Sequence, residues 1–515
     1  MPVDATTVPL RGGPAGERPA GGPRWRTRGR ARALAGANAV RVAGGLALAS
    51  IVALSLLVVV LAANRPSPLA STSHVNFFPH WMAGPLGGLW PGLTANGTTL
   101  EYLFTGAIAV MYVSYLVLVR YASQLPVRWV LGTIVAAHVI FALAPPLTLT
   151  DVFNYINYGR MEVVHHLNPY TTIPVLEPHN DPSYILSNWH ELLSPYGPLF
   201  TLLTFAVVPL GVAASFWVLK SMIALASLAS IFLVWRCARL LGRDPLAAVA
   251  FVGLNPIVLV WGLGGAHNDF LMVFFIMLGF YLLLLARERR KAGGPAGVGW
   301  RGWSLPLSAP EIAAGAAFVA AVALKASAAI LLPVVLVGLL RAPRSLLRVV
   351  LGMVVAGAVL GAASLLAFGL HIPDLSTQSQ VVSNESVPNL IGLAIGQGGE
   401  TEGLRAIMTG VLAIVVLLCC LLAWRRRESI TGSGWASVTL LFTLGWVLPW
   451  YVLWALPLAA LSSSRRLRTV VLVAGVYLIV AWAPSSGRLW DAIHFHPEST
   501  PLGRLHQRYI KELLR

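Results

Sequence analysis

Residues 41–63 read RVAGGLALASIVALSLLVVVLAA, a run in which Arg41 is the one charged residue. A helix needs about 20 consecutive apolar residues to cross the hydrocarbon core of a bilayer, so this run is long enough to span a membrane. It is too long for the apolar region of a signal peptide and has no clear small-residue cleavage site. We therefore expect it to remain in the protein as the first span.

The composition of the whole chain indicates that this span is one of many. Of 515 residues, 57% are hydrophobic and 11% are charged, whereas a soluble domain is charged at roughly a quarter of its positions. The mean hydropathy is +0.73. These values exclude a soluble globular protein and predict an all-α polytopic membrane protein.

Twelve further apolar runs are candidates for membrane-spanning helices, which gives about 13 in total. They lie near residues 100–119, 128–147, 214–235, 246–262, 270–286, 309–324, 326–341, 348–370, 405–424, 434–448, 450–462 and 468–484. Residues 1–40 are rich in Arg, Gly, Pro and Ala and lack the apolar pattern needed to fold. We therefore expect a disordered basic cytoplasmic tail over residues 1–40, a transmembrane domain over 41–484 and an extracytoplasmic tail over 485–515.

The distribution of basic residues predicts the orientation of these spans. The chain has 37 Lys and Arg against 20 Asp and Glu, a net charge of +17. The basic residues lie in short clusters between apolar runs, as is typical of cytoplasmic loops that face anionic headgroups and not of a nucleic-acid groove. The clusters are Arg120 with Arg128, Arg236 with Arg239 and Arg243, Arg287 through Lys291, Arg341 with Arg344 and Arg348, Arg425 through Arg427, and Arg465 with Arg466 and Arg468.

All six clusters fall on the side of the N-terminal arm only if residues 197–212 do not cross the membrane. We therefore predict that these residues form an interfacial or re-entrant helix. The outer face then carries four long segments, with helices in its loops. These segments are 64–99, 148–213, 371–404 and 485–515.

The segment DVFNYINYGRMEVVHHLNPY, residues 151–170, is the first dense group of polar residues after a long apolar stretch. As a helix it places five polar side chains on one face, namely Asp151, Asn154, Tyr155, Tyr158 and Glu162. Thr150 or Asp151 can equally be a simple helix cap. Arg160 lies about 180° from Asp151 on a straight helix, where it either forms a structural pair or contacts a phosphate.

A second polar group stands between two spans, in Gly264-Gly265-Ala266-His267-Asn268-Asp269. The glycine pair permits a positive φ and a close approach of a ligand to the backbone. His267 and Asp269 are placed to bind a metal, to hydrogen-bond a sugar or to cap the next helix. Asn255-Pro256 interrupts the preceding helix.

Lys325, one of four lysines in the chain, interrupts the apolar run VALKASAAILL. A cation at mid-bilayer costs at least about 2.5 kcal/mol, and a position at the outer end of a span lowers that cost by snorkelling. The partner expected for Lys325 is a phosphate or a carboxylate. Lys220, at the edge of another span, has no polar neighbours that suggest a site.

Two further outer segments have alternative interpretations. Residues 371–404 contain Gln378, Gln380 and Asn384, which are suited to bind a sugar or only to face solvent. LPWYVLWALPL, residues 448–458, is either an interfacial aromatic belt or a surface on which sugars stack.

The predicted topology brings distant residues to the outer leaflet: Asp151, Glu162, His267, Asp269 and Lys325. A transporter would carry its polar site near mid-bilayer between repeated halves, so this pattern favours an enzyme that acts at the outer surface. The alternative is a transporter or flippase of a lipid-linked sugar that uses Lys325 and Arg160 only to bind phosphate.

Five segments together resemble the actinobacterial polyprenol-phosphate-mannose-dependent α-1,6-mannopyranosyltransferases of lipomannan synthesis, which are membrane glycosyltransferases of the GT-C class. They are DVFNYINYGRMEVVHHLNPY (151–170), SPYGPLF (194–200), LNPIVLVWGLGGAHNDFLM (254–272), ALKAS (323–327) and PWYVLWALPL (449–458). The resemblance covers roughly residues 100–460. It implies a polyprenyl-phosphate-mannose donor, a lipid-linked or oligosaccharide mannoside acceptor, and inversion to an α-1,6 linkage at the extracytoplasmic face of the plasma membrane.

The resemblance also implies roles for individual residues. Asp151 matches the acidic catalytic residue that GT-C enzymes carry in the first large outer loop. Donor phosphate binding then falls to Lys325, His267 and Arg160, and sugar binding to Tyr155, Tyr158, Glu162, Asn268 and Asp269. Another polyprenyl-phosphate sugar donor, arabinose or glucose, is an alternative because a few hydroxyl contacts set donor identity.

The sequence predicts no required cofactor. The three cysteines, Cys237, Cys419 and Cys420, lie in or beside apolar runs and form neither a disulfide framework nor a CxxC metal motif. A divalent metal is permitted by His267 with Asp269 but is not predicted, because inversion with a lysine-held phosphate does not require one. No nucleic-acid partner is expected.

Overall fold

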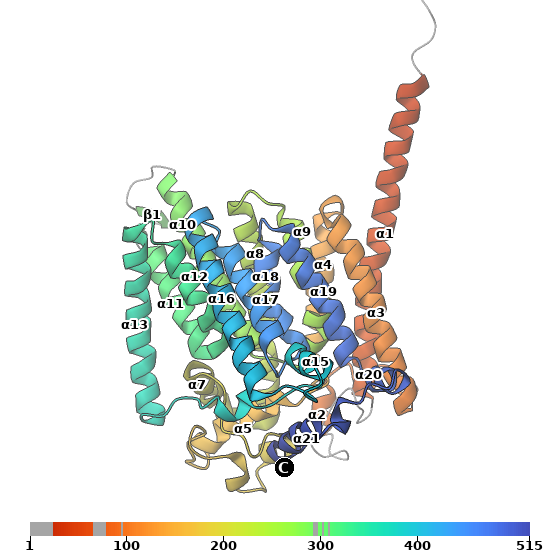
Figure 1. The fold of residues 1–515 in the computed structure, drawn as a ribbon. Coiled ribbons are helices and arrows are strands. Elements are labelled where there is room, and N and C mark those ends of the chain that lie inside the picture. Colours follow the sequence, from red (N-terminus) through yellow and green to blue (C-terminus); the bar gives the residue numbers. More distant parts are fainter. Residues whose placement is uncertain are drawn as a thin grey trace, which may run out of the picture.

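The computed structural model describes residues 24–64, 79–93, 96–291, 297–300, 303–306 and 309–514. They form an all-α bundle with one short hairpin of two antiparallel strands, β1 (Gly297–Trp300) and β2 (Trp303–Pro306) (Figure 1). The α-helices are α1 (Arg24–Ala63), α2 (His80–Ala83), α3 (Gly97–Tyr121), α4 (Val127–Ala142), α5 (Asp151–Val163), α6 (Pro182–Leu186), α7 (Pro198–Val207), α8 (Val212–Leu240), α9 (Pro245–Gly253), α10 (Asp269–Lys291), α11 (Ala309–Leu324), α12 (Leu331–Gly338), α13 (Pro343–Phe368), α14 (Ser376–Ser379), α15 (Val387–Ala394), α16 (Glu402–Arg426), α17 (Ser429–Thr443), α18 (Leu456–Ala460), α19 (Arg465–Trp482), α20 (Ser486–Ala492) and α21 (Pro501–Leu513).

Seven shorter helical turns connect these helices. Six of them are 3-10 turns: η1 (Ala122–Gln124), η2 (Pro174–Leu176), η3 (Val208–Leu210), η5 (Ala326–Ile330), η6 (Pro449–Trp454) and η7 (Pro497–Ser499). The seventh, η4 (Val258–Gly264), is a π-helix that follows the predicted break at Asn255-Pro256. The Asn255 side chain accepts hydrogen bonds from the backbone N–H groups of Ile257 and Val258. The side chain therefore replaces helical partners that the break removes.

The lengths of the helices confirm a polytopic membrane protein but not the number of spans. Six of the described helices are long and apolar enough to cross a membrane, namely α1, α3, α8, α10, α13 and α16. Two bent pairs, α9 with η4 and α19 with α20, raise this number to eight. The predicted count of 13 is not confirmed, because several of the other apolar runs form helices of 10–17 residues, among them α4 and α11.

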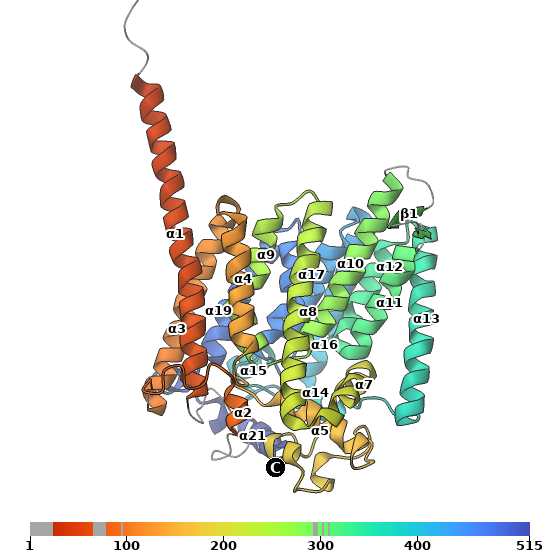
Figure 2. The same ribbon diagram turned by 180° about the vertical axis from the view of Figure 1, so that it is seen from behind.

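The bundle has two chemically different ends (Figures 1 and 2). We call one the basic end, because α8, α10 and α16 end there in basic residues and α19 begins there at Arg465. We call the other the loop end, which carries α2, α5, α7, α15, α20 and α21. The charge clusters thus share one end, as the sequence predicts.

Helix α7 has 10 residues and rises about 15 Å, half the thickness of the hydrocarbon core. Gly211, with φ of 79°, then turns the chain into α8. A helix of this length does not cross a membrane by itself, in agreement with the interfacial or re-entrant segment predicted for residues 197–212.

Helix α1 begins at Arg24, inside the stretch expected to form the basic tail, and extends beyond the rest of the bundle (Figure 2). Ala and Arg are strong helix formers and no proline follows Pro23 in this stretch, so the helix of the first span continues into the basic arm. Residues 1–23 lie outside the described residues. At the other terminus, residues 485–513 form α20, η7 and α21.

Candidate active site

A cavity at the loop end lies where segments far apart in the sequence meet. Four of the predicted site residues line it: Asp151, Tyr155, Tyr158 and Lys325. Its other lining residues include Asn188, Trp189, Tyr196, Gln378, Trp446, Trp450, Tyr451, Ile510 and Leu514. Helix α5, the loop before α7, residues 446–451 and the C-terminal segment therefore form one site.

Asp151 is the first residue of α5, and its side chain is 15% exposed. Thr150 occupies the N-cap position, but its side chain makes no capping hydrogen bond, and its hydroxyl is buried without a partner. Capping by Thr150 therefore does not explain the start of this helix. One carboxylate oxygen of Asp151 lies 3.4 Å from Nδ1 of His267, within ion-pair distance but without hydrogen-bond geometry.

His267 is fully buried, and its ring stacks on Trp450 with 3.4 Å between the ring centroids. Neither ring nitrogen has a hydrogen-bond partner among the residues that the structure describes. A Cβ atom on Gly265 would lie 2.4 Å from Nε2 of His267, so the glycine is required by this ring. The expected approach of a ligand to the glycine pair is therefore replaced by contact with His267, and the positive φ falls on Ala266.

Lys325 has the carboxylate partner that the sequence predicts. Its Nζ donates to both carboxylate oxygens of Asp269, at 2.9 Å each, and lies 5.1 Å from the ring centre of Tyr451. The indole N–H of Trp454 also donates to Asp269. Because Asp269 is fully buried, it holds Lys325 at the cavity wall and does not itself reach the cavity.

Glycine brings the segment before α7 close to Lys325. The backbone N–H of Gly197 donates to the carbonyl of Leu324, and a Cβ at residue 197 would lie 2.2 Å from the carbonyl oxygen of Ala323. Any other residue here would separate α7 from the end of α11. The SPYGPLF motif therefore acts as a close packing contact that places Tyr196 beside Lys325 in the cavity wall.

Two of the predicted sugar-binding residues line the cavity, two lie behind its wall and one lies away from it. Tyr155 and Tyr158 line the cavity, but their hydroxyls already bond within the protein, Tyr158 to the carbonyl of Leu192 and Tyr155 to the backbone N–H of Asn268. Asn268 is buried behind them, and both polar atoms of its side-chain amide lack a partner. Glu162 does not line the cavity, because it lies about 16 Å further along α5 than Asp151.

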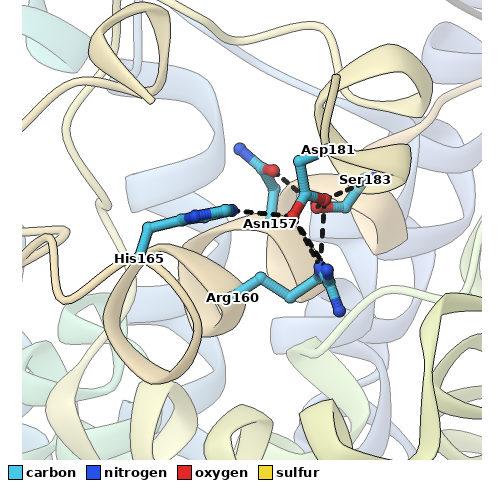
Figure 3. A network of polar contacts seen from close by, with 5 residues as sticks. All are labelled: Asn157, Arg160, His165, Asp181 and Ser183. Carbon is cyan, nitrogen blue, oxygen red and sulfur yellow. Dashed lines mark hydrogen bonds and ion pairs between the residues drawn. The ribbon is translucent and has the colours of Figure 1, made fainter. Parts of the chain in front are cut away.

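Arg160 is bound away from the cavity in a network of the outer loop (Figure 3). Its guanidinium donates to both oxygens of Asp181, and His165 and Ser183 contact the same carboxylate. Burial alone would raise the pKa of Asp181, but hydrogen bonds from Arg160, Ser183 and His165 hold this pKa well below its usual value. The structural pairing considered for Arg160 is the arrangement that the structure contains.

Several site residues were not assigned from the sequence. Trp450, Tyr451 and Trp454 are at least 93% buried and contact His267, Lys325 or Asp269, so the belt interpretation of residues 448–458 is wrong. The signal that would have found them is the position of the aromatic residues between two prolines in a broken helix. Gln378 was noted as a sugar ligand or a solvated residue, and it lines the cavity.

No group of three or more His, Cys, Asp or Glu side chains in the described ranges is arranged to hold a metal ion. The permitted pair of His267 and Asp269 is divided, since Asp269 binds Lys325 and His267 faces Asp151.

Comparison with known proteins shows to which family the chain belongs. Residues 41–341 match the family described as alpha-(1->6)-mannopyranosyltransferase, N-terminal domain. The chain belongs to this mannopyranosyltransferase family. Residues 387–496 match a second family description, the MptB C-terminal domain. The first match contains Asp151, His267 and Lys325, and the second contains Trp450, so the cavity lies between the two matched regions.

Curated relatives of this mannopyranosyltransferase family member come from several actinobacteria. The chain is 27% identical to alpha-(1->6)-mannopyranosyltransferase A of Mycobacterium tuberculosis over 68% of its length and 69% of the relative. It is 28% identical to a probable alpha-(1->6)-mannopyranosyltransferase of Mycolicibacterium smegmatis over 74% of each chain. It is 26% identical to alpha-(1->6)-mannopyranosyltransferase A of Corynebacterium glutamicum, over 62% of this chain and 68% of the relative. No solved structure matches.

Proposed function

We propose that the protein transfers mannose from a polyprenyl-phosphate-mannose donor to a mannoside acceptor, forming an α-1,6 linkage with inversion. The reaction would take place at the extracytoplasmic face of the plasma membrane, in lipomannan-type synthesis of cell-envelope glycans. The names of the relatives support mannosyl transfer. The structural observation that carries the proposal is that Asp151 and Lys325, 174 positions apart, line one cavity at the loop end.

Asp151 is the base of the proposed reaction. A sugar hydroxyl is a poor nucleophile, so a carboxylate within hydrogen-bond reach must accept its proton as it attacks the anomeric carbon. Asp151 faces the cavity, and within the described chain its one close basic side chain is His267 at 3.4 Å. Its oxygens are therefore available to an acceptor hydroxyl, while His267 and the Trp450 ring behind it fix the position of the carboxylate.

Lys325 stabilises the leaving phosphate. The phosphate gains negative charge as the bond to mannose breaks, and a cation already in place at the site stabilises that charge without reorganisation. Asp269 and Trp454 hold the ammonium group from behind. An ammonium has three donors, so a donor remains for a phosphate oxygen on the cavity side.

A second hollow of about 420 Å³ adjoins the cavity at Lys325 and has the chemistry of a lipid-phosphate site. Pro195, Lys325, Gln378, Trp446 and Tyr451 line both spaces. The hollow continues between α16 and α17, where Leu412, Leu440 and Leu444 form apolar walls and Arg405, which is held by Glu400 at 2.9 Å, adds a second cation. A polyprenyl chain fits such walls, with its phosphate near the two cations.

The sugar contacts in the proposed site differ from those expected from the sequence. Besides Asp151 and Lys325, the wall carries polar groups that a sugar can meet on Asn188, Gln378 and four tyrosines, Tyr155, Tyr158, Tyr196 and Tyr451. Asn268 and Asp269 support the wall from behind. Arg160 and Glu162 are left out of the proposed site.

The decisive experiment is a transfer assay with the purified protein in lipid vesicles. We expect radiolabelled mannose to pass from polyprenyl-phosphate-mannose to a mannoside acceptor, with α-1,6 linkage in the product. Polyprenyl-phosphate arabinose and glucose serve as the competing donors. Faster transfer of either sugar would overturn the donor assignment, and movement of the lipid across the vesicle without transfer would identify a flippase.

A further inference from the structure

A second charged cavity, of about 560 Å³, lies at the basic end of the bundle. It is enclosed by the last turns of α8, α10 and α12 and by the junction between α16 and α17. Helix α10 begins at Asp269 behind the active-site wall and reaches this cavity at Phe280, 11 residues later, a rise of about 16 Å. The two cavities share no lining residue and are therefore separate sites.

The lining of this second cavity carries an excess of positive charge. Five arginines line it, among them Arg287 from α10, Arg341 from the turn after α12 and Arg427 from the C-cap of α16. In the described part of the chain, none of the three has a carboxylate within ion-pair distance. Arg341 lies 5.0 Å from the ring centre of Trp424, which holds it in place.

The two carboxylates in the lining do not neutralise these arginines. Glu311 is almost fully buried and is bound by Arg290 and Arg348, both outside the set of three. Glu428 accepts a hydrogen bond from Ser463. A cavity of this kind attracts an anion, since unpaired guanidinium groups favour the planar oxygen pairs of a phosphate.

Part of the remaining wall is apolar, beside the polar residues Arg243, Arg290, Lys291, Ser429 and Thr431. Phe280, Leu283 and Leu284 of α10 face Leu339 at the end of α12 across it. A soluble anion gains nothing from such walls, whereas the acyl region of a phospholipid gains burial of apolar surface. Basic pockets between the cytoplasmic ends of membrane helices are suited to anionic headgroups.

We propose that the cavity at the basic end binds an anionic phospholipid of the cytoplasmic leaflet. Arg287, Arg341 and Arg427 hold the headgroup phosphate, and the leucines of α10 and α12 contact the first part of the acyl chains. The site does not depend on the proposed transfer reaction, since it lies at the other end of the bundle and uses none of the residues of the active site.

The test uses the purified full chain with labelled phosphatidylglycerol in mixed micelles, followed by measurement of the lipid retained after gel filtration. The variant Arg287→Gln/Arg341→Gln/Arg427→Gln should retain lipid at least about tenfold more weakly than the unchanged protein. The matched control, Arg344→Gln/Arg425→Gln/Arg466→Gln, removes the same charge from exposed arginines outside the cavity lining and should retain the lipid normally. Elution and melting temperature verify that both variants fold.

Three outcomes would overturn the proposal. Equal loss in the two variants would show that general surface charge binds the lipid. Equal retention of labelled phosphatidylcholine would show that the cavity does not select for negative charge. Binding of inorganic phosphate that depends on the three arginines, without retention of phosphatidylglycerol, would assign the cavity to a soluble anion.

Discussion

Two aspartates in the same outer segment, Asp181 and Asp151, are used in opposite ways. Asp181 is 2% exposed and accepts hydrogen bonds from Arg160, His165 and Ser183. Asp151 is 15% exposed and, among the described residues, has one basic side chain within 4 Å, His267, with no hydrogen bond between them. One carboxylate is fully engaged by the protein, and the other faces a cavity.

The polar neighbours of the two aspartates also differ in whether they have a partner. Around Asp181, the side chains of Arg160 and His165 both use it as a partner. Around Asp151, both ring nitrogens of His267 and the amide of Asn268 are buried without partners. Native proteins leave few buried polar groups unpaired, so a concentration of them behind the cavity wall indicates that this part of the protein serves a substrate and not only the fold. Networks in which the partners are present have a structural role.

The strongest test of this contrast is the substitution Asp151→Asn. If Asp151 is the base, its loss should lower kcat for mannosyl transfer by about 10²–10⁴-fold, the usual contribution of a positioned general base. The melting temperature should change little, because Asp151 makes no hydrogen bond that the amide would lose. The assay is the vesicle transfer reaction with radiolabelled donor.

The control for this variant is Glu162→Gln, which removes a carboxylate from the same helix outside the cavity. It should retain turnover within about twofold, since it leaves the base untouched. Normal turnover by Asp151→Asn, or an equal loss in both variants, would remove Asp151 from the mechanism.

For Asp181→Asn we expect the opposite result, a loss of stability with little loss of turnover. Arg160 and His165 would then lose their carboxylate partner, and breaking a buried pair costs about 3 kcal/mol of stability. The pKa of Asp181 is held below its usual value of 3.8 in the folded protein, so the stability it contributes is present above pH 4 and is lost as the pH falls. The melting difference between the two proteins should therefore shrink in acid.

The folded fraction of Asp181→Asn should turn over at nearly the normal rate, measured per molecule recovered by gel filtration. A variant that melts normally but loses turnover would place the loop network in the reaction and would erase the contrast with Asp151.

Lys325→Ala should have a smaller effect on the reaction, concentrated on the donor. Loss of one charged hydrogen bond to the phosphate should raise the KM for the donor by about 10–100-fold, with little change in the KM for the acceptor. Lys325→Arg keeps the pair with Asp269 and should recover part of the affinity. Equal changes in both KM values would show that Lys325 supports the fold and does not contact the phosphate.

The sequence predicted much of the fold, because spans and basic clusters are local properties. The run at residues 41–63 is apolar whatever surrounds it, and the basic clusters limit which loops can share a side. Break points such as Asn255-Pro256 were equally visible. The number of spans could not be predicted from the sequence, because the lengths of helices such as α4 and α11 depend on packing in the bundle.

The sequence predicted candidate site residues where a polar residue stands in an apolar stretch. Lys325 and His267 stand in apolar sequence, and the structure places both at or behind the cavity wall. Glu162 was grouped with them from helix periodicity. Arg160 was included as a phosphate contact although periodicity placed it on the opposite face, and the sequence could not show its partner Asp181 on another segment. Trp450 was missed because aromatic residues near a predicted membrane boundary have an ordinary explanation in the interface.

Glu177 is a loop carboxylate that, unlike Asp181, has no partner among the described residues. Its substitution yields the smallest effect that we predict. It lies in the same outer loop as Asp181, but both of its carboxylate oxygens are buried without partners. Burial raises its pKa from 4.5 to about 8. Between these values the unfolded chain ionises while the folded protein keeps the proton, so Glu177 lowers stability as the pH rises from about 4.5 to 8.

Glu177→Gln removes this ionisation and should raise the melting temperature by about 1–3 °C at pH 8. At pH 4.5 and below the two proteins should melt nearly alike, since the folded wild type is protonated there, which makes the acid measurement an internal control. A reduced rate of mannosyl transfer, with no gain in stability at pH 8, would mean that this unpaired carboxylate belongs with Asp151 among the groups reserved for a substrate. The absence of a hydrogen-bond partner would then indicate function in the loop as it does in the cavity.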